Sequence, residues 1–523
     1  MKKRTIIFGV LTCCILCSIT LFVTSYRFID AEITPKWLGL MLCIGIMGLV
    51  WSIQGNKISF TDFLSKYLFG TIIVFALVLS IQGILQYVGT FPYSSNKFAV
   101  TGSFDNPAGY AAALTCSFPF CFLFFRNKTL YIRYAAILAA VLMMIVVILS
   151  GSRAGILSIA VVILAWLFFQ PLKRLYKLKF IFFIAIVVLT FVLYFIKKDS
   201  ADGRLLIWRC TLDMVTDKPV FGHGVGSFNA KYMLYQAAYF NDYPNSRYAQ
   251  LADNVQHPFN EYLFILAEYG IAGLGVVVLV GLLLVCIYRR NHDYEKLIAL
   301  MSLVALSVFS LFSYPFKYPF TWVILLFNIA IICKVKIRKS YLMRITVFLL
   351  SVGLLTYTFM VTQAEIKWRR MTHLSLTGKT NQVLPEYEKL YRILGRNGLF
   401  LYNHAAELHK AKEFERSVAV FECCLRHYND MDIQMMLASN YKELGKYTEA
   451  EKHLKTAAAM CPARFMPLYE LVKLYQVTGR SDEAMVLAKK IIDKDVKIPS
   501  STVIEIVNEM KRFLETKETS HDL

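Results

Sequence analysis

The chain has 523 residues, of which 57% are hydrophobic, 14% aromatic and only 18% charged. A soluble domain of this length does not need so many apolar residues for its core, so the composition excludes an ordinary soluble enzyme and indicates that most of the chain faces lipid. The formal net charge of +21 would favour a nucleic-acid partner for a soluble protein, whereas in a membrane protein the positions of Lys and Arg indicate its orientation.

The N-terminal segment is basic from Met1 to Arg4 and apolar from Thr5 to Val23. Signal peptides and first membrane helices share this pattern. The segment has no cleavage site of the A-x-A type, and another apolar run follows at once. An uncleaved membrane helix is therefore the favoured interpretation.

Apolar runs of similar length recur as far as residue 363. A helix of about 20 apolar residues crosses the bilayer core, which is about 30 Å thick. We therefore predict an all-α, polytopic membrane domain over residues 1–363 with about 11 transmembrane helices. They are expected near residues 5–25, 37–54, 67–88, 106–125, 131–149, 154–170, 180–196, 261–288, 297–313, 319–334 and 345–363.

The short loops between these spans separate by charge. One set holds only Arg27, Lys36, Lys97, Arg153 and Lys317. The alternate set is much more basic and contains Lys2, Lys3, Arg4, Lys57, Lys66, Arg126, Lys128, Arg133, Lys173, Arg174, Lys177, Lys179, Arg289, Arg290, Lys296, Lys334, Lys336, Arg338, Lys339 and Arg344. The positive-inside rule places the basic set and the N-terminus in the cytoplasm. An odd number of spans then places the long loop 197–258 and the C-terminal region outside it.

The twelve cysteines show neither metal-ligand spacing nor paired disulfide spacing. Eight of them lie inside apolar runs: Cys13, Cys14, Cys17, Cys43, Cys116, Cys121, Cys286 and Cys333. We interpret them as small apolar packing residues.

The first candidate site is Gly151–Gly155, a very short turn between two spans on the predicted outer side. Arg153 in this turn has two interpretations. It can anchor the span by reaching lipid phosphates, or it can bind a substrate phosphate through the two parallel hydrogen bonds of its guanidinium group.

The second candidate lies in the long loop, in the run DGRLLIWR followed by KPVFGHGVG. Arg204 and Arg209 are expected near the outer membrane boundary, with Trp208 as an interfacial anchor. The glycines of Gly222–Gly226 follow no predicted parallel strand, so a tight turn after Pro219 is favoured over a nucleotide-binding loop.

The third candidate is His257, immediately before the apolar helix that begins in HPFNEYLFILAEYGIAGLG. A histidine can accept a proton near neutral pH, so His257 is a candidate general base. The alternative is a hydrogen-bonded histidine that orders the loop. His223 is a weaker rival, and Asp253 is a candidate to orient His257.

Beyond residue 363 charged residues become frequent, and helical periodicity replaces the apolar runs. Gly378, Ala411, Gly445 and Gly479 lie 33 or 34 residues apart, and the residues expected to pack between the helices recur at the same interval: Tyr387, Phe421, Leu454 and Ala488, and again Leu390, Cys424, Ala457 and Ile491. Stacked helical hairpins require such a period. The unit YKELGKYTEAEKHLKTAAAMCP closely resembles a tetratricopeptide repeat. We predict a tetratricopeptide-like α-solenoid over residues 364–523, with an ordinary helical bundle as the alternative.

GSRAG, GRLLIWR…KPVFGHGVGSFN and HPFNEYLFILAEYGIAGLG occur in this order over roughly residues 60–335. In this the chain resembles the O-antigen ligase and O-antigen polymerase superfamily. The resemblance implies a membrane glycosyltransferase that takes a glycan from a polyprenyl-diphosphate-linked donor on the outer face of the cytoplasmic membrane. It further implies inversion at the anomeric carbon, without a nucleotide sugar, a metal or another cofactor.

The same resemblance assigns residues. The catalytic set is Arg153, Arg204 and His257, and Arg153, Arg204 and Arg209 are the expected substrate-binding residues. Which of Arg204 and Arg209 faces the diphosphate stays open. The expected acceptor is a hydroxyl group of a glycan, of lipid A-core or of a protein, and the repeats are a candidate site for a protein partner. No nucleic acid is expected.

Three other functions compete with this one. The closest keeps the chemistry but transfers the glycan to hydroxyl side chains of exported proteins. A transporter is disfavoured because the spans lack the internal ionisable residues that mark translocation paths. A non-catalytic scaffold would make Arg153 and His257 dispensable.

Overall fold

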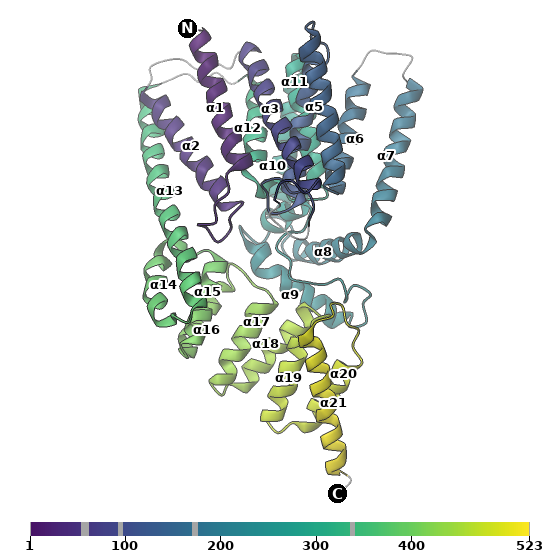
Figure 1. Ribbon diagram of the computed structural model, residues 1–523, viewed down its shortest axis with the longest axis vertical. Coiled ribbons are helices and arrows are strands. Elements are labelled where there is room, and N and C mark those ends of the chain that lie inside the picture. Colours follow the sequence, from purple (N-terminus) through teal and green to yellow (C-terminus); the bar gives the residue numbers. More distant parts are fainter. Residues whose placement is uncertain (1, 54–61, 93–97, 170–175, 335–339, 522–523) are drawn as a thin grey trace. The chain divides into compact units, whose positions relative to one another are not determined.

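A computed structural model of the protein describes residues 2–53, 62–92, 98–169, 176–334 and 340–521 (Figure 1). Over these ranges the regular secondary structure is entirely helical, in agreement with the all-α prediction. Part of the charge pattern used above lies outside the described residues, namely Lys57, Lys97, Lys173, Arg174, Lys336, Arg338 and Lys339.

The chain divides into two compact units. The first, here called the membrane unit, contains Met1–Ile196, Phe259–Tyr262 and Gly275–Arg369. The second, here called the loop–repeat unit, contains Lys197–Pro258, Leu263–Leu274 and Arg370–Leu523. The long loop thus forms one compact unit with the C-terminal repeats.

The membrane unit is a set of apolar helices that run alongside one another (Figure 1). Two helices extend beyond it: α10 passes through both units, and α13 runs across the predicted domain boundary at residue 363. The helices are α1 Lys2–Phe22, α2 Thr34–Ile53, α3 Asp62–Tyr87, α4 Pro107–Ser117, η1 Phe118–Leu123, α5 Leu130–Leu149, α6 Arg153–Phe168, α7 Tyr176–Ile196, α10 Glu261–Arg290, α11 Tyr294–Ser310, η3 Pro315–Lys317, α12 Pro319–Cys333 and α13 Tyr341–Leu376.

Within the described ranges, five helices are long and apolar enough to cross a membrane: α2, α3, α5, α10 and α13. A sixth span results if α7 and the following helix α8 (Lys198–Asp217) form one bent span. Shorter apolar helices lie at Gly9–Phe22, Pro107–Leu123, Arg153–Phe168 and Pro319–Cys333. The chain is therefore a multi-pass membrane protein, while the number of 11 spans stays a prediction.

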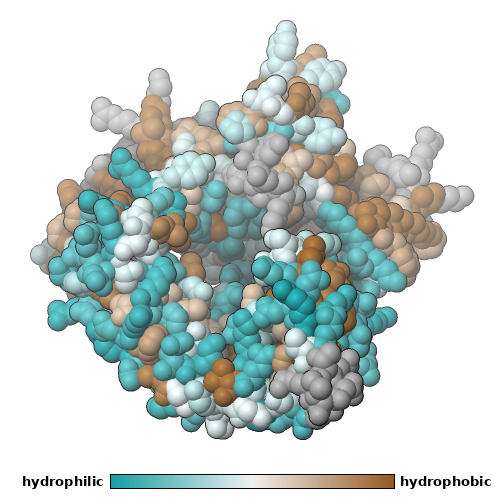
Figure 2. Space-filling view, turned by 60° about the horizontal axis from the view of Figure 1, so that its bottom comes forward, coloured by the Kyte–Doolittle hydropathy of each residue, from teal (hydrophilic) through white to brown (hydrophobic). Residues whose placement is uncertain are grey.

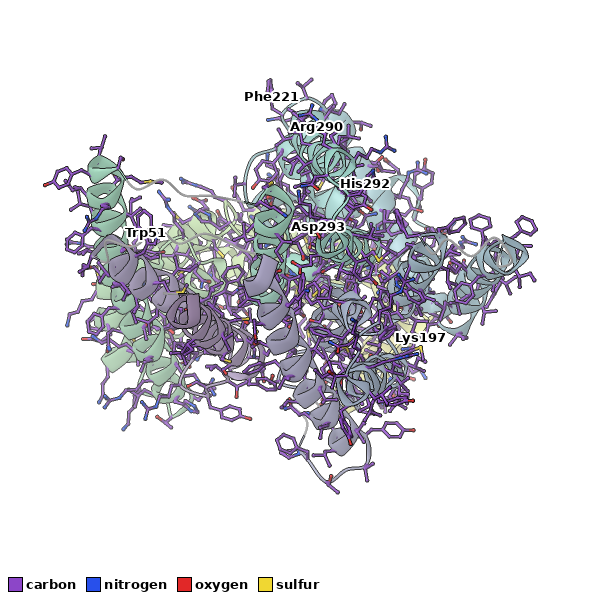
Figure 3. The ribbon with its side chains drawn as sticks, turned by 90° about the horizontal axis from the view of Figure 1, so that it is seen from above. Trp51, Lys197, Phe221, Arg290, His292 and Asp293 are labelled. Atoms are coloured by element: carbon purple, nitrogen blue, oxygen red, sulfur yellow. The ribbon has the colours of Figure 1, made fainter. Side chains whose placement is uncertain are left out.

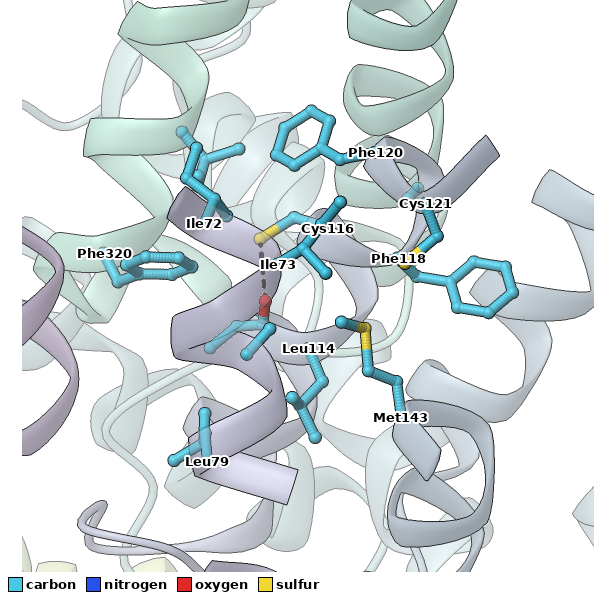
Figure 4. Packing of buried hydrophobic residues seen from close by; sticks show 14 of the residues in the cluster. Ile72, Ile73, Leu79, Leu114, Cys116, Phe118, Phe120, Cys121, Met143 and Phe320 are labelled. Carbon is cyan, nitrogen blue, oxygen red and sulfur yellow. Dashed lines mark hydrogen bonds between the residues drawn. The ribbon is translucent and has the colours of Figure 1, made fainter. Parts of the chain in front are cut away.

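The core of the membrane unit is built around α4, in which every residue from Gly109 to Ser117 is buried. This helix contacts α3, α5, α6, α11 and α12, and its alanines allow that close approach. A Cβ atom on Gly109 would lie 2.5 Å from the ring of Tyr318. Large side chains of the same core, such as Ile72, Phe118 and Phe320, pack together with residues of α4 (Figure 4).

On the outside of the same unit, large apolar side chains are exposed, among them Ile148, Phe191 and Leu279. An apolar surface of this kind is typical of helices that face lipid. The turn from α10 to α11 is polar instead (Figure 3). There Asp293 caps α11 by accepting from the Glu295 backbone N–H, and it forms an ion pair with Lys334 at 3.1 Å.

The loop–repeat unit is made of amphipathic helices, and in the repeats their surface is mainly hydrophilic (Figure 2). Two of them, α8 Lys198–Asp217 and α9 Ser227–Asp242, lie in the long loop. The repeat helices are α14 Thr380–Leu394, α15 Gly398–Lys410, α16 Phe414–Cys424, α17 Met431–Glu443, α18 Tyr447–Met460, α19 Met466–Val477, α20 Ser481–Ile492 and α21 Ser501–His521. Consecutive repeat helices contact each other, as helical hairpins require, while a superhelical solenoid stays a prediction.

The turns of the repeats correct one sequence assignment. Gly378, Gly445 and Gly479 adopt positive φ just before a repeat helix, as expected for glycine. In the remaining repeat Lys412 has this conformation, with φ of 62°, and Ala411 is a right-handed residue at the end of α15. Ala411 is therefore not the equivalent of the glycines. Aligning the repeats by sequence pairs the small residue Ala411 with the glycines, whereas the backbone places the left-handed residue one position later, at Lys412.

The predicted apolar positions of the repeats are confirmed as core. The buried side chains at these positions are Tyr387, Phe421, Leu454, Ala488, Leu390, Cys424, Ala457 and Ile491. All twelve cysteines of the chain are free, and seven of them, including Cys424 and Cys461, are buried. Of the eight cysteines predicted to pack in apolar runs, Cys17, Cys43, Cys116 and Cys121 are buried as predicted, whereas Cys286 and Cys333 are exposed.

Candidate functional site

The glycine-containing turn 218–226 is fixed against a break in α10. The break is at Gly270, with φ 64° and ψ −164°, and it frees backbone groups of α10 from their helical partners. The Ile271 N–H donates to Pro219 O at 2.8 Å, and the His223 N–H donates to Ala267 O at 2.9 Å. The turn thus replaces hydrogen bonds that the helix loses.

Glycine is required on both sides of this contact. A Cβ atom on Gly222 would lie 2.4 Å from the backbone carbon of Glu268, and one on Gly270 would lie 2.3 Å from Val220 O. The two glycines therefore let two backbones touch. The predicted tight turn after Pro219 is confirmed, and packing against α10 explains its Gly222.

His223 uses both of its ring nitrogens within the loop–repeat unit. Nε2 lies 2.9 Å from Met214 O, and Nδ1 lies 3.3 Å from the Lys231 ammonium. Because a carbonyl can only accept and an ammonium can only donate, the ring carries its proton on Nε2. His223 is thus a structural histidine that links the turn to α8 and α9.

The segment 249–258, which leads to His257, is attached to the repeats. Arg464 donates to both carboxylate oxygens of Asp253 at 2.9 Å. Asp253 is thereby paired with the repeats, which argues against the predicted role in orienting His257. The fully buried Gln236 of α9 donates to Met460 O at 2.7 Å and to Asp253 O at 3.1 Å.

Further side chains of this segment also reach the repeats. Asn254 donates to the Asp432 carboxylate at 3.2 Å and accepts from the Met431 N–H at 3.1 Å. Gln256 donates to the Tyr428 hydroxyl at 3.1 Å. In the other direction, Lys497 donates to Ala252 O at 3.2 Å.

The helix α8 carries both candidate loop arginines and contacts the histidine segment. The Trp208 indole N–H donates to Pro258 O at 2.9 Å, so this tryptophan has a partner inside the protein. Arg204 is half-buried and lies four residues before Trp208, hence on the same face of α8. Arg209 is exposed and lies on another face. The geometry therefore favours Arg204 over Arg209 as the neighbour of the histidine segment.

His257 is half-buried and lies between two anchored neighbours. Gln256 contacts Tyr428, and Pro258 accepts from Trp208. The next residue, Phe259, has φ of 53°, a left-handed conformation that is costly for a bulky side chain. Such strain persists only where the surroundings over-determine the backbone, so the path of the chain at His257 is tightly specified.

Arg153 belongs to the membrane unit and is the first residue of α6. Gly151, with φ of 67°, makes the preceding turn, and the Ser152 side chain caps the helix by accepting from the Gly155 N–H. The guanidinium group is half-buried and donates to Leu193 O of α7 at 3.4 Å. Arg153 therefore lies at a helix N-terminus, where backbone N–H groups favour an anion.

The membrane unit also contains a polar cluster that the sequence patterns do not predict. Asp105 forms an ion pair with Lys317 at 2.9 Å and accepts from the Tyr318 hydroxyl at 2.8 Å. The fully buried Lys36 donates to Ser103 O at 2.6 Å. The only signals in the sequence are two proline-containing turns, SFDNP and YPFKYP, which carry no chemical signature. In the part of the chain that the structure describes, no group of three or more His, Cys, Asp or Glu residues is placed to hold a metal ion.

Comparisons with known proteins support one class. Residues 138–278 match the family model described as O-antigen ligase, and this range includes Arg153, Arg204, Arg209 and His257. No curated protein shows significant similarity to the chain. The fold and the matched region thus define a multi-pass helical membrane protein that is similar over residues 138–278 to the O-antigen ligase family and carries repeated helical hairpins in its C-terminal part.

Solved structures with some similarity include three crystal structures. MamA is 14% identical, with 29% of this chain and 97% of that chain covered and a TM-score of 0.24. The APC/C hetero-tetramer Cut9–Hcn1 is 10% identical, with 92% and 77% covered and a TM-score of 0.25. Yeast Tom70 is 10% identical, with 92% and 96% covered and a TM-score of 0.26. At these TM-scores the likenesses carry no argument about this chain.

Proposed function

We propose that the protein transfers a glycan from a polyprenyl-diphosphate-linked donor to a hydroxyl acceptor on the outer face of the cytoplasmic membrane. The match of residues 138–278 to the O-antigen ligase model supports a ligase-like function in surface polysaccharide synthesis. The observation that carries the assignment of residues is the hydrogen bond from Trp208 to Pro258. It joins the helix that bears Arg204 to the segment that bears His257.

The chemistry follows from the donor. Breaking a sugar–diphosphate bond develops negative charge on the leaving phosphate, and fixed cations in a site shielded from water stabilise that charge strongly. Arg153 and Arg204 are assigned this role, without a metal ion. Guanidinium groups suit it because each can give a phosphate two parallel, charge-assisted hydrogen bonds.

His257 is assigned the role of general base. It takes the proton of the acceptor hydroxyl while that oxygen attacks the anomeric carbon from the face opposite the diphosphate, which inverts the configuration. The diphosphate leaves with the electron pair of the broken bond. His223 does not fit this role because both of its ring nitrogens already have partners in the protein.

The proposed orientation places the N-terminus in the cytoplasm and both the loop 197–258 and the repeats outside it. Its support is the charge difference between alternate loops. A reporter that is active only outside the cytoplasm, fused after residue 365, should be active. Activity restricted to a cytoplasmic reporter at the same position would overturn the orientation and the proposed site with it.

The acceptor decides between ligation, polymerisation and protein glycosylation. Deleting the gene and separating lipid-linked from surface glycans distinguishes them. Loss of attachment with full-length glycan retained on the lipid indicates a ligase, and loss of ladder length indicates a polymerase. Loss of glycan from exported proteins alone indicates protein O-glycosylation. Unchanged glycans in all three pools would exclude glycan transfer.

A further inference from the structure

The repeats hold residues 249–256 at several points. A domain that only recruits a partner has no need of such contacts. The anchors come from several repeat positions: Tyr428 before α17, Asp432 within it, Arg464 after α18 and Lys497 after α20. Contacts at this many separate points fix both the position and the orientation of a segment. The segment itself has no regular helix to stiffen it.

One of these contacts is a partly exposed ion pair. Arg464 approaches the Asp253 carboxylate with two hydrogen bonds of 2.9 Å to the two oxygens. Both hydrogen bonds come from a single guanidinium nitrogen, Nη2, and are charge-assisted. On the His257 side of this pair, Asn254 adds a hydrogen bond to the Asp432 carboxylate and Gln256 adds one to the Tyr428 hydroxyl. Without these anchors the backbone before His257 would regain much of its conformational freedom.

We propose that the tetratricopeptide-like repeats are a positioning part of the transfer site: through Arg464 and Asp253, supported by Asn254 and Gln256, they hold the segment that presents His257. The catalytic consequence rests on the function proposed above. In this arrangement the repeats act on the reaction from within the same compact unit, whether or not they also bind a protein. Asp253, Asn254, Gln256 and Arg464 are positioning residues that touch no reacting atom.

This role predicts a specific kinetic defect. Releasing the segment leaves the donor-binding arginines Arg153 and Arg204 in place, so the KM for the donor should stay within about twofold. The proton acceptor is displaced, and a misplacement of about 1 Å can cost about 100-fold in rate. We therefore expect kcat to fall about 10-fold to 100-fold in Arg464→Ala and in Asp253→Ala. A recruitment role would instead raise the KM for the natural acceptor alone.

The test compares full-length variants in detergent or nanodiscs. Arg464→Ala breaks the contact with the segment. Arg480→Ala is the matched control, because Arg480 pairs with Glu451 and Glu483 entirely within the repeats. The double variant Asp253→Arg with Arg464→Asp restores the pair in reverse. Amide hydrogen exchange over residues 249–262 reports the attachment without any substrate, and transfer from lipid-linked glycan purified from the producing cells reports catalysis.

We expect at least about 10-fold faster exchange and reduced kcat in Arg464→Ala, neither in Arg480→Ala, and recovery of both in the double reversal. If Arg464→Ala fails to fold, Gln256→Ala with Asn254→Ala removes two uncharged side chains of the segment and should show the same pattern. Unchanged exchange, or equal effects in the Arg480 control, would refute the attachment. Faster exchange with parental kcat would refute the positioning role. If the parent protein transfers no glycan, the proposed function falls and its catalytic consequence with it, while the exchange comparison still decides the attachment.

Discussion

The two histidine-bearing segments of the loop–repeat unit, residues 218–226 and 249–258, are held in opposite ways. The first is fixed by backbone hydrogen bonds to α10 and by glycines that let the two backbones touch. The second is fixed by side chains, and the Arg464 that holds it lies 211 residues further along the chain than Asp253. The first segment is therefore a rigid local turn, whereas the position of the second depends on a distant part of the fold.

This difference supports the different roles proposed for the two histidines of the loop, His223 and His257. The first segment is held through its backbone and tolerates little change. In it, His223 is a structural residue with hydrogen bonds at both ring nitrogens. The second segment is held through residues on either side of His257, and His257 is the residue that the proposed function assigns to chemistry. The following predictions test this contrast.

The largest difference is expected between glutamine substitutions of the two histidines. His257→Gln should lower kcat for glycan transfer roughly 100-fold to 10,000-fold, because glutamine keeps hydrogen-bonding capacity but cannot take the proton. His223→Gln should cost less than about 10-fold, through loosening of the turn. Transfer from purified lipid-linked donor at equal protein levels measures both. Near-parental turnover of the His257 variant would remove His257 from the mechanism, and the reverse order would move the base to His223.

The second prediction concerns the pH dependence of the repeats that hold residues 249–258. His404 is buried against Tyr387, with ring centroids 5.3 Å apart, and burial lowers its pKa from 6.5 to about 4. The unfolded chain therefore binds a proton more readily than the folded one. Stability is complete above about pH 6.5 and is lost as the pH falls towards about 4, by about 3 kcal/mol in total.

Chemical unfolding of the full-length protein at pH 7.5 and at pH 4.5 measures this loss. His404→Phe keeps the aromatic stack and has no titrating group, so its stability should change less over the same interval. Equal pH dependence in the parent and the variant would rule out His404 as the source.

The third prediction separates the two arginines of α8. Arg204→Ala should lower kcat/KM about 10-fold to 100-fold and raise the KM for the donor, because a cation that faces diphosphate acts in the ground state and the transition state. Arg209→Ala should change kcat/KM less than about threefold, since Arg209 is exposed on another face of the helix. The reverse result would mean that the face marked by Trp208 does not point to the donor.

The smallest effect is expected at Lys412, whose φ of 62° is unfavourable for lysine. Lys412→Gly should stabilise the repeats by about 0.5 kcal/mol, because relief of the backbone outweighs the added freedom of the unfolded chain. Gly445→Ala is the matched control. It has open space around its Cβ position, so it tests the backbone alone and should destabilise by about 1 kcal/mol. Denaturant titration of both variants measures the effects, and a destabilised Lys412→Gly protein would contradict the assignment.

Sequence alone was sufficient for features that depend on local periodicity and composition. Apolar runs indicated an all-α, multi-pass membrane region, and the 33- to 34-residue period located the repeats and their buried positions, from Tyr387 to Ile491. Both follow from short-range rules, since a helix that faces lipid or packs in a hairpin repeats its apolar residues at a fixed interval. The order of the three motifs also led to the O-antigen ligase resemblance that the match over residues 138–278 supports.

Only the tertiary structure could decide which motif residues are structural and which flank the candidate base. The sequence KPVFGHGVG is the same whether its glycines bind phosphate or let a turn pack against α10. Only the short distance from the Cβ position of Gly222 to the backbone of Glu268 distinguishes these two roles. Arg204 and Arg209 differ by the face of α8 on which they lie relative to Trp208 and Pro258. The pairing of Asp253 with Arg464 joins residues whose spacing follows no periodicity, because long-range side-chain contacts are set by the packing of whole elements rather than by local pattern.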